Sequence, residues 1–564
     1  MTIRFLFYLA VIISGLFYGV VHAEDVAKQP PPKYNLLFIM TDQHRYDVLG
    51  AAGNPVVKTP NLDALAADGV RFTSAYTPCP VCSPARTSIL TGRSIFSTGT
   101  DTNAIAQKTP PDLPVWKLAS FDAILNQRGY FSEYHGKWHS PIILAGISKT
   151  TDKSFYHNFG YAVLKDNGTF RYGNDEKDAL SESIRKNAPF DIHDLKDGLQ
   201  YEPRFLRPYA PVATDIRYGK PSPKTLNKNV AGKNTNDEEE EKKNGVVFGK
   251  LLLDAKFSQT SFQRDLSLKS LDDALNSGKP FNVTASFSFP HPPYVVTEPY
   301  FSLYRDENNR PVKELDALIS PNIDDHSYDS PYSSTPSRRL HYCYDRKKIT
   351  DFMSVYYALT TEVDESIGRL IQKLKENGEY NNTLIIYTSD HGEMLGAHGR
   401  NGKGVFYEES VRVPLIVKLP KGEHAGLVVD RLVSTRDLFS TILDYAIADT
   451  QTVSEGQSLR TVIENPQTAN WNDYEIIEWS HKNAAAPSYC VVSKDWKLML
   501  SRSDKAKSAL YDLKNDPNEL VNLLAENNLL RQKEYRRQKE ILKSNLLEFL
   551  QKTGHTDYEN IKTR

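Results

Sequence analysis

The chain has 564 residues and a formal net charge of -1, from 69 lysines and arginines against 70 aspartates and glutamates. This balance argues against a general binder of nucleic acid, because no bulk positive charge attracts a polyanion. A hydrophobic content of 40% is that of a globular protein, and the length predicts one large domain with a smaller one.

The N-terminus has the pattern of an export signal. Arg4 precedes an apolar run over residues 5–21, and small residues stand near Ala23. This pattern predicts a signal peptide over residues 1–23, cleaved near Ala23, and therefore a periplasmic or secreted protein. A membrane anchor is the alternative, because the run is nearly long enough to span a bilayer. Cleavage is the preferred interpretation, so no stable membrane anchor is expected.

Four apolar runs predict buried strands of one sheet, and polar residues directly follow the first three. The runs cover residues 35–40, 281–289, 383–387 and 414–417. Between the second and third runs, apolar residues recur at helical spacing from Leu359 to Leu374, which predicts an amphipathic helix. The alternation indicates an α/β fold with a large, mostly parallel sheet flanked by helices. Ligands of such sheets bind at the carboxyl ends of the strands.

Composition also divides the chain into parts. Residues 34–460 are predicted to form the α/β domain, and a polar region over residues 148–271 interrupts it as an insertion of unknown fold. After the α/β domain, four short strands are predicted at residues 474–479, 489–492, 496–500 and 508–511. A charged helix is predicted to follow them over residues 529–550. Residues 461–564 should therefore form a smaller subdomain with an antiparallel sheet and one packed helix.

The stretch from Cys82 to Arg86 is the most informative motif. It places a thiol beside Pro84 and a permanent cation, and a helix-compatible run follows. The thiol is therefore expected near a helix N-terminus, where free N–H groups and the helix dipole favour negative charge. A nucleophile beside such an anion site suits transfer chemistry on a sulfate or phosphate ester.

Cys82 has alternative interpretations. Together with Cys79 it forms a C-x-x-C pair, which could be a redox pair, a structural element or half of a zinc site. A zinc site would need a second pair, but Cys343 and Cys490 are isolated in the sequence. Whether Cys343 and Cys490 pair with each other is left open.

The motif resembles the signature of the type I sulfatases, which belong to the alkaline-phosphatase-like superfamily. In that family the cysteine of C-x-P-x-R is oxidised to formylglycine by a maturation enzyme. Landmarks of the resemblance extend from Asn35 to Leu513. The resemblance implies an alkaline-phosphatase-like fold, a formylglycine-generating enzyme as a partner, and hydrolysis of O-sulfate esters by formylglycine at position 82.

The resemblance also implies a site for one divalent cation. Two residue pairs match the metal-ligand pairs of the family, Asp42 with Gln43 and Asp390 with His391, and the modified Cys82 completes the set. Ca²⁺ is the expected ion, because it prefers oxygen ligands. Mn²⁺ is the alternative, since Gln43 lacks the charge of the commoner aspartate and His391 offers a nitrogen that suits a transition metal.

Lys137 and His139 match a Lys-x-His element of the family. Residues two apart on an extended segment point to the same side, so both side chains can reach one sulfate group. The resemblance implies that Arg86 and Lys137 stabilise the charge on the sulfate oxygens. It assigns His139 to the second hydroxyl of the hydrated aldehyde, whose deprotonation would expel sulfate.

Three further residues are implied in substrate binding. His291 is flanked by prolines and matches the histidine that protonates the departing alcohol, and Lys403 lies between glycines and matches a second substrate lysine. His398 could line the substrate pocket beside the sulfate, with a plain loop histidine as its alternative. Each match is weak alone, and their common order along the chain supports the set.

The sequence therefore predicts an exported sulfatase. Export and the polar insertion favour a sulfated carbohydrate or polysaccharide as its substrate. One alternative is a choline-sulfatase-like enzyme for small molecules, and another is a phosphonate or phosphodiester hydrolase on the same fold. A third is an inactive relative that binds sulfated glycans without hydrolysis.

Overall fold

The computed structural model describes residues 34–103, 114–141, 163–164, 170–171, 248–292, 294–324, 330–332, 346–449, 452–479, 486–503, 507–525 and 533–564. The expected signal peptide and most of the polar insertion lie outside these residues. Within them, no helix combines the length and the apolar character that crossing a bilayer requires.

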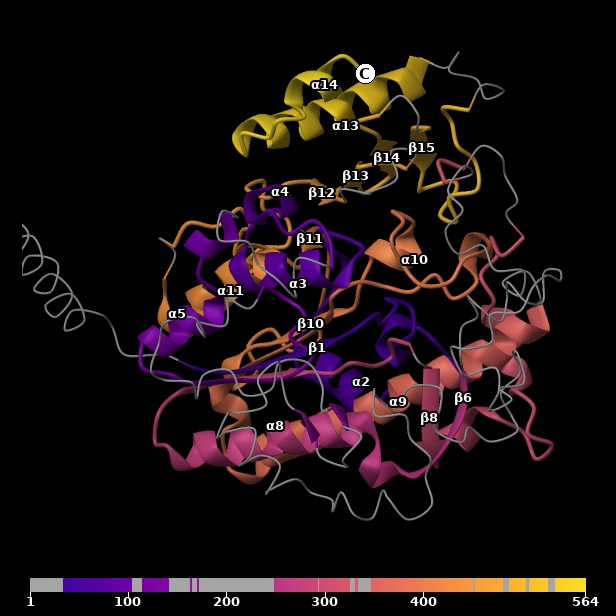
Figure 1. Ribbon diagram of the computed structural model, residues 1–564. Helices are drawn as coiled ribbons and strands as arrows, with labels where there is room; N and C mark the ends of the chain where they lie inside the picture. The colour runs from indigo at the N-terminus through magenta and orange to yellow at the C-terminus, as the bar shows by residue number, and fades with distance from the viewer. Residues whose placement is uncertain are drawn as a thin grey trace, which may run out of the picture.

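A seven-stranded sheet forms the centre of the molecule (Figure 1), in the order β11-β2-β10-β9-β1-β7-β3. Its strands are β1 (Asn35–Thr41), β2 (Val70–Tyr76), β3 (Phe131–Gly136), β7 (Phe281–Ser286), β9 (Thr383–Ser389), β10 (Leu415–Lys418) and β11 (Leu427–Ser434). Every neighbouring pair is parallel except those of β10, which is antiparallel to both β9 and β2. The predicted large, mostly parallel sheet is thus confirmed.

Helices cover both faces of this sheet. Leu37 and Ile39 of β1 pack on one face in a cluster with residues of α2 (Pro60–Ala67), α8 (Gln259–Asn276) and α9 (Arg346–Glu376). Leu36 and Phe38 pack on the opposite face, in a cluster with residues of α3 (Cys82–Thr91), α5 (Phe121–Gln127) and α11 (Asp437–Ile447). Burial on both sides explains why β1 is a continuous apolar run rather than an alternating one.

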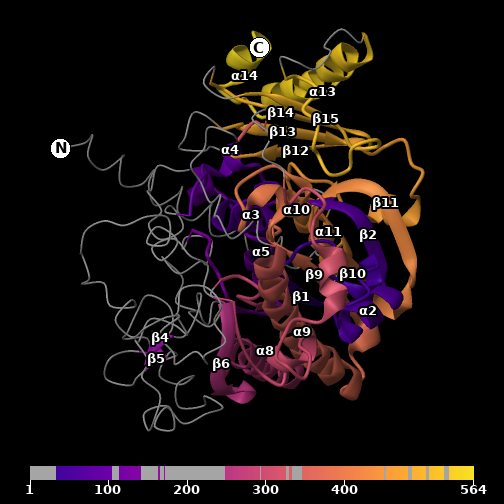
Figure 2. The same ribbon diagram turned by 90° about the vertical axis from the view of Figure 1, so that its right-hand side faces the viewer.

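The C-terminal subdomain is a separate four-stranded antiparallel sheet (Figure 2). Its strands are β12 (Tyr474–Glu478), β13 (Tyr489–Ser493), β14 (Trp496–Leu500) and β15 (Ala509–Asp512), and α13 (Lys533–Lys552) packs on one face. The other face packs against Phe406 and Tyr407 of the larger domain. The predicted sheet and helix are thus confirmed. The segment after residue 460 contributes α12 (Arg460–Glu464) and Trp471 to a hydrophobic cluster of the large sheet.

Part of the polar region predicted as an insertion belongs to the core fold. β6 (Phe248–Asp254) pairs with β8 (Tyr294–Glu298), and α8 contacts β3, β7 and α9, so the predicted boundary at residue 271 falls inside a helix. The sequence gives no clear signal for α8, because many of the residues that this helix buries are small or polar, among them Thr260, Gln263 and Ser267. Hydrophobic periodicity cannot detect such a face.

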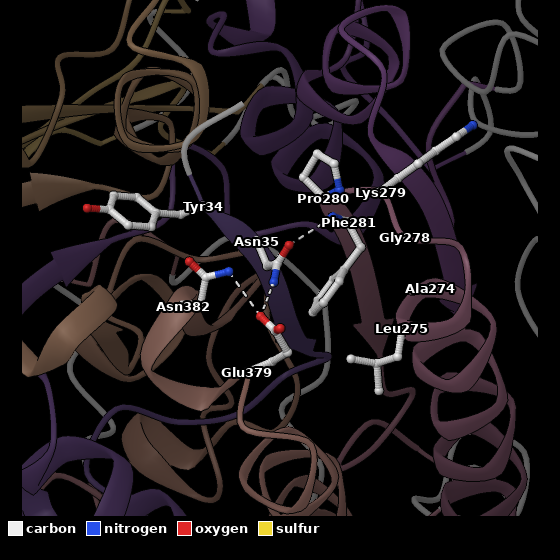
Figure 3. A pocket seen from close by; sticks show the side chains of 10 residues that line it. All are labelled: Tyr34, Asn35, Ala274, Leu275, Gly278, Lys279, Pro280, Phe281, Glu379 and Asn382. Atoms are coloured by element: carbon white, nitrogen blue, oxygen red, sulfur yellow. Dashed lines mark hydrogen bonds between the residues drawn. The ribbon is translucent and has the colours of Figure 1, made fainter. Parts of the chain in front are cut away.

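The described residues also include shorter elements. Among them are α4 (Ile95–Thr98), α10 (Glu408–Val411), α14 (Tyr558–Lys562) and a β4–β5 pair (Val163–Leu164 with Phe170–Arg171). At the amino ends of β1 and β7 a small polar hollow contains Asn35, Glu379 and Asn382 (Figure 3). There Glu379 accepts hydrogen bonds from Asn35 (2.9 Å) and Asn382 (3.0 Å). This hollow lies at the edge of the sheet opposite to the carboxyl ends of the strands.

A buried ion-pair network joins β14 of the small sheet to α10 of the large domain. Lys497 of β14 is fully buried, and its Nζ lies 2.7 Å from Glu408 and 2.8 Å from Glu519. We expect Lys497→Met to lower the free energy of unfolding by about 3–5 kcal/mol, because two buried carboxylates lose their common cation. Lys494→Met is the matched control, since that lysine pairs with Asp430 in solvent. Equal denaturation midpoints for the two variants would contradict the role assigned to Lys497.

Candidate active site

The carboxyl ends of the parallel strands bring most of the predicted site residues together. Asp42 directly follows β1, Lys137 follows β3, and Asp390 follows β9. His291 lies five residues beyond the end of β7 in the loop to β8, and Cys82 opens α3 just beyond β2. This placement is the one expected for ligands of a parallel sheet.

Cys82 is the first residue of α3, as the sequence predicted. Val81 before it has an extended backbone (φ -146°), and the helix closes at Gly92, whose φ of 65° suits glycine. All ten residues of α3 are buried, so the thiol is held at a fixed point. Among the described residues, Cys79, Cys82 and Cys490 are buried and form no disulfide. Cys343 lies outside the described residues.

Four buried side chains could hold a metal ion. The ligand atoms of Asp42, Cys82, Asp390 and His391 all lie within 4.8 Å of one another. His391 Nδ1 donates to the Gly392 carbonyl (2.9 Å), so Nε2 is the nitrogen directed at the cluster, 3.1 Å from Cys82 Sγ. A ligating histidine is commonly held by such a bond from its second nitrogen. The residues therefore fit a divalent cation bound by carboxylate oxygens and one imidazole nitrogen.

Gln43 lies beside this cluster with an unusual backbone. Its φ is 72°, a left-handed conformation that is uncommon outside glycine, and its N–H donates to Asp390 Oδ1 (3.1 Å). Its side-chain Oε1 accepts a hydrogen bond from Lys403 Nζ (2.6 Å), which lies 3.9 Å from Asp42 Oδ1. The structure thus places the Gln43 oxygen at the border between the metal-binding residues and Lys403.

Arg86 is fully buried and holds the two aspartates of the site. Its Nε donates to Asp390 Oδ2 (2.7 Å), and its Nη2 lies 3.3 Å from Asp42 Oδ2. Its Nη1 donates to the Lys137 carbonyl (2.6 Å) and to the Ser286 hydroxyl (2.8 Å). Through these contacts Arg86 orients the two carboxylates and the backbone of Lys137.

The charges in the site strongly affect its acidic groups. Burial raises the pKa of Cys82, but nearby positive groups outweigh burial and hold that pKa well below its usual range: Lys137, Lys403 and His391. Burial and the Cys82 charge raise the pKa of Asp42, yet positive neighbours that include both lysines keep it far below its usual range. A buried group of cations around position 82 favours an anionic substrate.

Lys137, His139 and His291 surround Cys82. Lys137 Nζ donates to Asp42 and lies 3.8 Å from Cys82 Sγ, and a hydrogen bond from His139 helps to lower the pKa of Cys82. His291 Nδ1 donates to the Pro292 carbonyl (2.7 Å), and Nε2 lies 3.9 Å from Asp42 Oδ1. The His291 side chain is 32% exposed, which places it at the opening of the site.

One histidine from the sequence analysis does not join this group. His398 stacks on Tyr407, with ring centroids 3.7 Å apart, and its side chain lies in a group with the carboxylates of Glu409 and Glu519. Its φ of 51° and the bond from its N–H to the Asn322 carbonyl (3.1 Å) fix a turn that directs the ring there. The pocket role expected for His398 therefore finds no support in its position.

Sequence reasoning missed three buried residues that contact the site: Ser286, Tyr294 and Glu393. Ser286 and Tyr294 lie on strands. The apolar residues beside them were the only sequence signal, and they indicate burial rather than a role in the site. Glu393 follows His391 by two residues and accepts hydrogen bonds from Tyr294 (2.9 Å) and from the Gln43 side chain. A carboxylate so close to a predicted ligand pair was the one signal that the sequence offered.

Known proteins resemble the chain over almost its whole length. A family model described as Sulfatase matches residues 34–448, and one described as N-sulphoglucosamine sulphohydrolase, C-terminal, matches residues 396–552. An arylsulfatase of Clostridium perfringens is 28% identical over 546 residues, covering 93% of this chain and 96% of that protein. An N-acetylglucosamine-6-O-sulfatase of Bacteroides thetaiotaomicron is 27% identical over 536 residues, covering 93% and 87%.

A solved structure shows the same fold. The phosphonate monoester hydrolase of Agrobacterium radiobacter superposes with a TM-score of 0.64 at 22% identity, covering 92% of this chain and 96% of that one. Such a likeness supports the alkaline-phosphatase-like architecture predicted from the motifs. Because the Sulfatase model spans well over half of the chain, the protein belongs to the sulfatase family of sulfuric ester hydrolases.

Proposed function

We propose that the protein hydrolyses O-sulfate esters of a carbohydrate, with formylglycine at position 82 and one bound divalent cation. The observation that carries this proposal is the position of Cys82 at the N-terminus of α3, among Asp42, Asp390, His391 and Lys137. The carbohydrate part is supported by the N-acetylglucosamine-6-O-sulfatase among the relatives. Export through the predicted signal peptide and maturation by a formylglycine-generating enzyme belong to the same proposal.

The cation and formylglycine would supply complementary chemistry. The cation, held by Asp42, Asp390, His391 and the Gln43 oxygen, would lower the pKa of an oxygen beside it and draw charge from the sulfate. Formylglycine, as its hydrate, would supply a nucleophilic oxygen at position 82 and a second hydroxyl whose loss of a proton releases sulfate. An unmodified thiol offers no such second hydroxyl.

The residues around position 82 have separate roles in this proposal. Lys137 and Lys403 bind the sulfate oxygens and stabilise the negative charge that grows on them. His291 is the general acid in its doubly protonated form, in which Nδ1–H donates to the Pro292 carbonyl and Nε2 carries the proton that is transferred. Burial and the two lysines lower the pKa of His291 to about 4, and a bound anionic ester opposes that shift. His139 is the base for the second hydroxyl.

The first test is mass spectrometry of the tryptic peptide of residues 72–86, from protein matured in its native host. We expect formylglycine at position 82, because the thiol lies in the motif that resembles the modified signature. The result can be interpreted only for fully matured protein. Protein co-expressed with a maturation enzyme is therefore the control. An unmodified thiol in active protein would overturn the proposed nucleophile.

The substrate class is tested by a matched panel of esters. A phosphonate or phosphodiester hydrolase is the competing activity, because the phosphonate monoester hydrolase shares the fold. Sulfated N-acetylglucosamine, choline sulfate and a phenyl phosphonate monoester are compared by kcat/KM. We expect the sulfated sugar to give the highest value. Preference for choline sulfate or the phosphonate would assign the alternative activity, and binding of a sulfated glycan without sulfate release would indicate an inactive relative.

A further inference from the structure

Glu393 lies in the loop after β9 and has no role in the site described so far. Its carboxylate is fully buried, and Oε1 accepts the backbone N–H groups of Leu395 (3.0 Å) and Gly402. Gly402 directly precedes Lys403, so this oxygen fixes the backbone that carries the lysine. One side of the Glu393 carboxylate therefore holds the loop of a predicted substrate-binding residue.

The other oxygen of Glu393 controls the Gln43 side chain. Oε2 accepts hydrogen bonds from Gln43 Nε2 and from the Tyr294 hydroxyl (2.9 Å), and Gln43 Nε2 also donates to Tyr294 (2.8 Å). A carboxylate can only accept hydrogen bonds, and the Lys403 ammonium on the far side can only donate them. The amide of Gln43 must then direct its N–H₂ group to Glu393 and its oxygen to Lys403 and the metal-binding residues.

We propose that Glu393 is a positioning residue that aims the Gln43 oxygen at the metal site. Gln43 is a neutral ligand at a position where the commoner aspartate would carry a negative charge. Glu393 supplies a negative charge directly behind the Gln43 amide. The inference rests on the proposed function, because it assumes that a divalent cation binds beside Asp42. Outer partners of this kind commonly change metal affinity by about 10- to 100-fold when they are removed.

The variant Glu393→Gln tests the orientation with little change in shape. Its Oε1 can still accept the N–H groups of Leu395 and Gly402, and the Tyr294 hydroxyl can turn to donate elsewhere. Its new N–H₂ group would face the N–H₂ group of Gln43, so the Gln43 amide must turn and present hydrogens to the cation. We expect the dissociation constant for Mn²⁺ to rise about 10- to 100-fold.

An exchanged pair restores the complementary contact. In the double variant Gln43→Glu with Glu393→Gln, the new amide at position 393 donates to the new carboxylate at position 43. An oxygen again faces the cation, so we expect the Mn²⁺ dissociation constant to return to within about threefold of the original. A purely structural role for Glu393 predicts no such rescue, because both members of the pair have been changed.

The measurement is a titration of matured, chelator-treated protein with Mn²⁺, followed by EPR, with Ca²⁺ added in competition. Glu362→Gln is the control, because Glu362 is a buried carboxylate of α9 outside the site. Equal affinity of the Glu393→Gln variant and the original protein would overturn the inference, as would an exchanged pair as weak as that single variant. An original protein that binds neither ion would instead contradict the proposed metal site.

Discussion

Replacing Cys82 with alanine is expected to reduce sulfate release by about 10⁴-fold or more, because the proposed nucleophile is lost while the charged site remains. The other metal-competent groups, Asp42, Asp390 and His391, do not depend on the thiol for their position, since Arg86 and backbone groups hold them. Substrate binding should therefore survive. The measurements are sulfate release by ion chromatography and binding of the sulfated sugar by calorimetry.

Cys79→Ala is the matched control for this variant. Cys79 is buried three residues before Cys82 and packs with Val81, Ala85 and Ile95, so its removal leaves only a small cavity. A nucleophile at position 82 predicts near-normal turnover for Cys79→Ala. If both variants lost turnover equally, the C-x-x-C pair would be the functional unit, and the proposed chemistry at position 82 would be wrong.

The parts of the fold that the sequence predicted well have strong local signals. β1 is buried on both faces and is therefore continuously apolar from Leu36 to Met40, and the apolar face of α9 repeats at helical spacing. The direction of β10 was not predictable in the same way. Its apolar residues Leu415, Ile416 and Val417 give no indication of direction, and only their pairing with β2 and β9 makes the strand antiparallel.

The site shows the same division between local and distant information. Asp42 and Asp390 could be placed because both directly follow predicted strands, and parallel strands end at one edge. The contacts of Glu393 could not be predicted, because Gln43 lies 350 residues away in the sequence and Tyr294 lies 99 away. His398 has the residue type of a site histidine, but a left-handed turn directs it elsewhere, and the sequence does not reveal that turn.

His291→Asn is expected to separate substrates by their leaving groups. A sugar alkoxide is a poor leaving group, so the loss of a general acid should lower kcat/KM for a sulfated sugar by about 10²–10⁴-fold. A nitrophenolate leaves without a proton, so 4-nitrophenyl sulfate should lose less than about tenfold. The exposure of His291 at the opening, with Nδ1 held by Pro292, leaves Nε2 as the nitrogen that can reach the departing oxygen.

His398→Asn provides the comparison for this experiment, since it removes a buried imidazole that stacks on Tyr407 rather than facing Cys82. Any loss that it causes should be equal for the sugar sulfate and the nitrophenyl sulfate, because a packing defect does not distinguish leaving groups. An equal loss for both substrates in His291→Asn would mean that His291 binds sulfate without transferring a proton. A selective loss in His398→Asn would instead assign the acid role to His398. Only a loss that grows with the basicity of the leaving group, and only at His291, fits proton donation from Nε2.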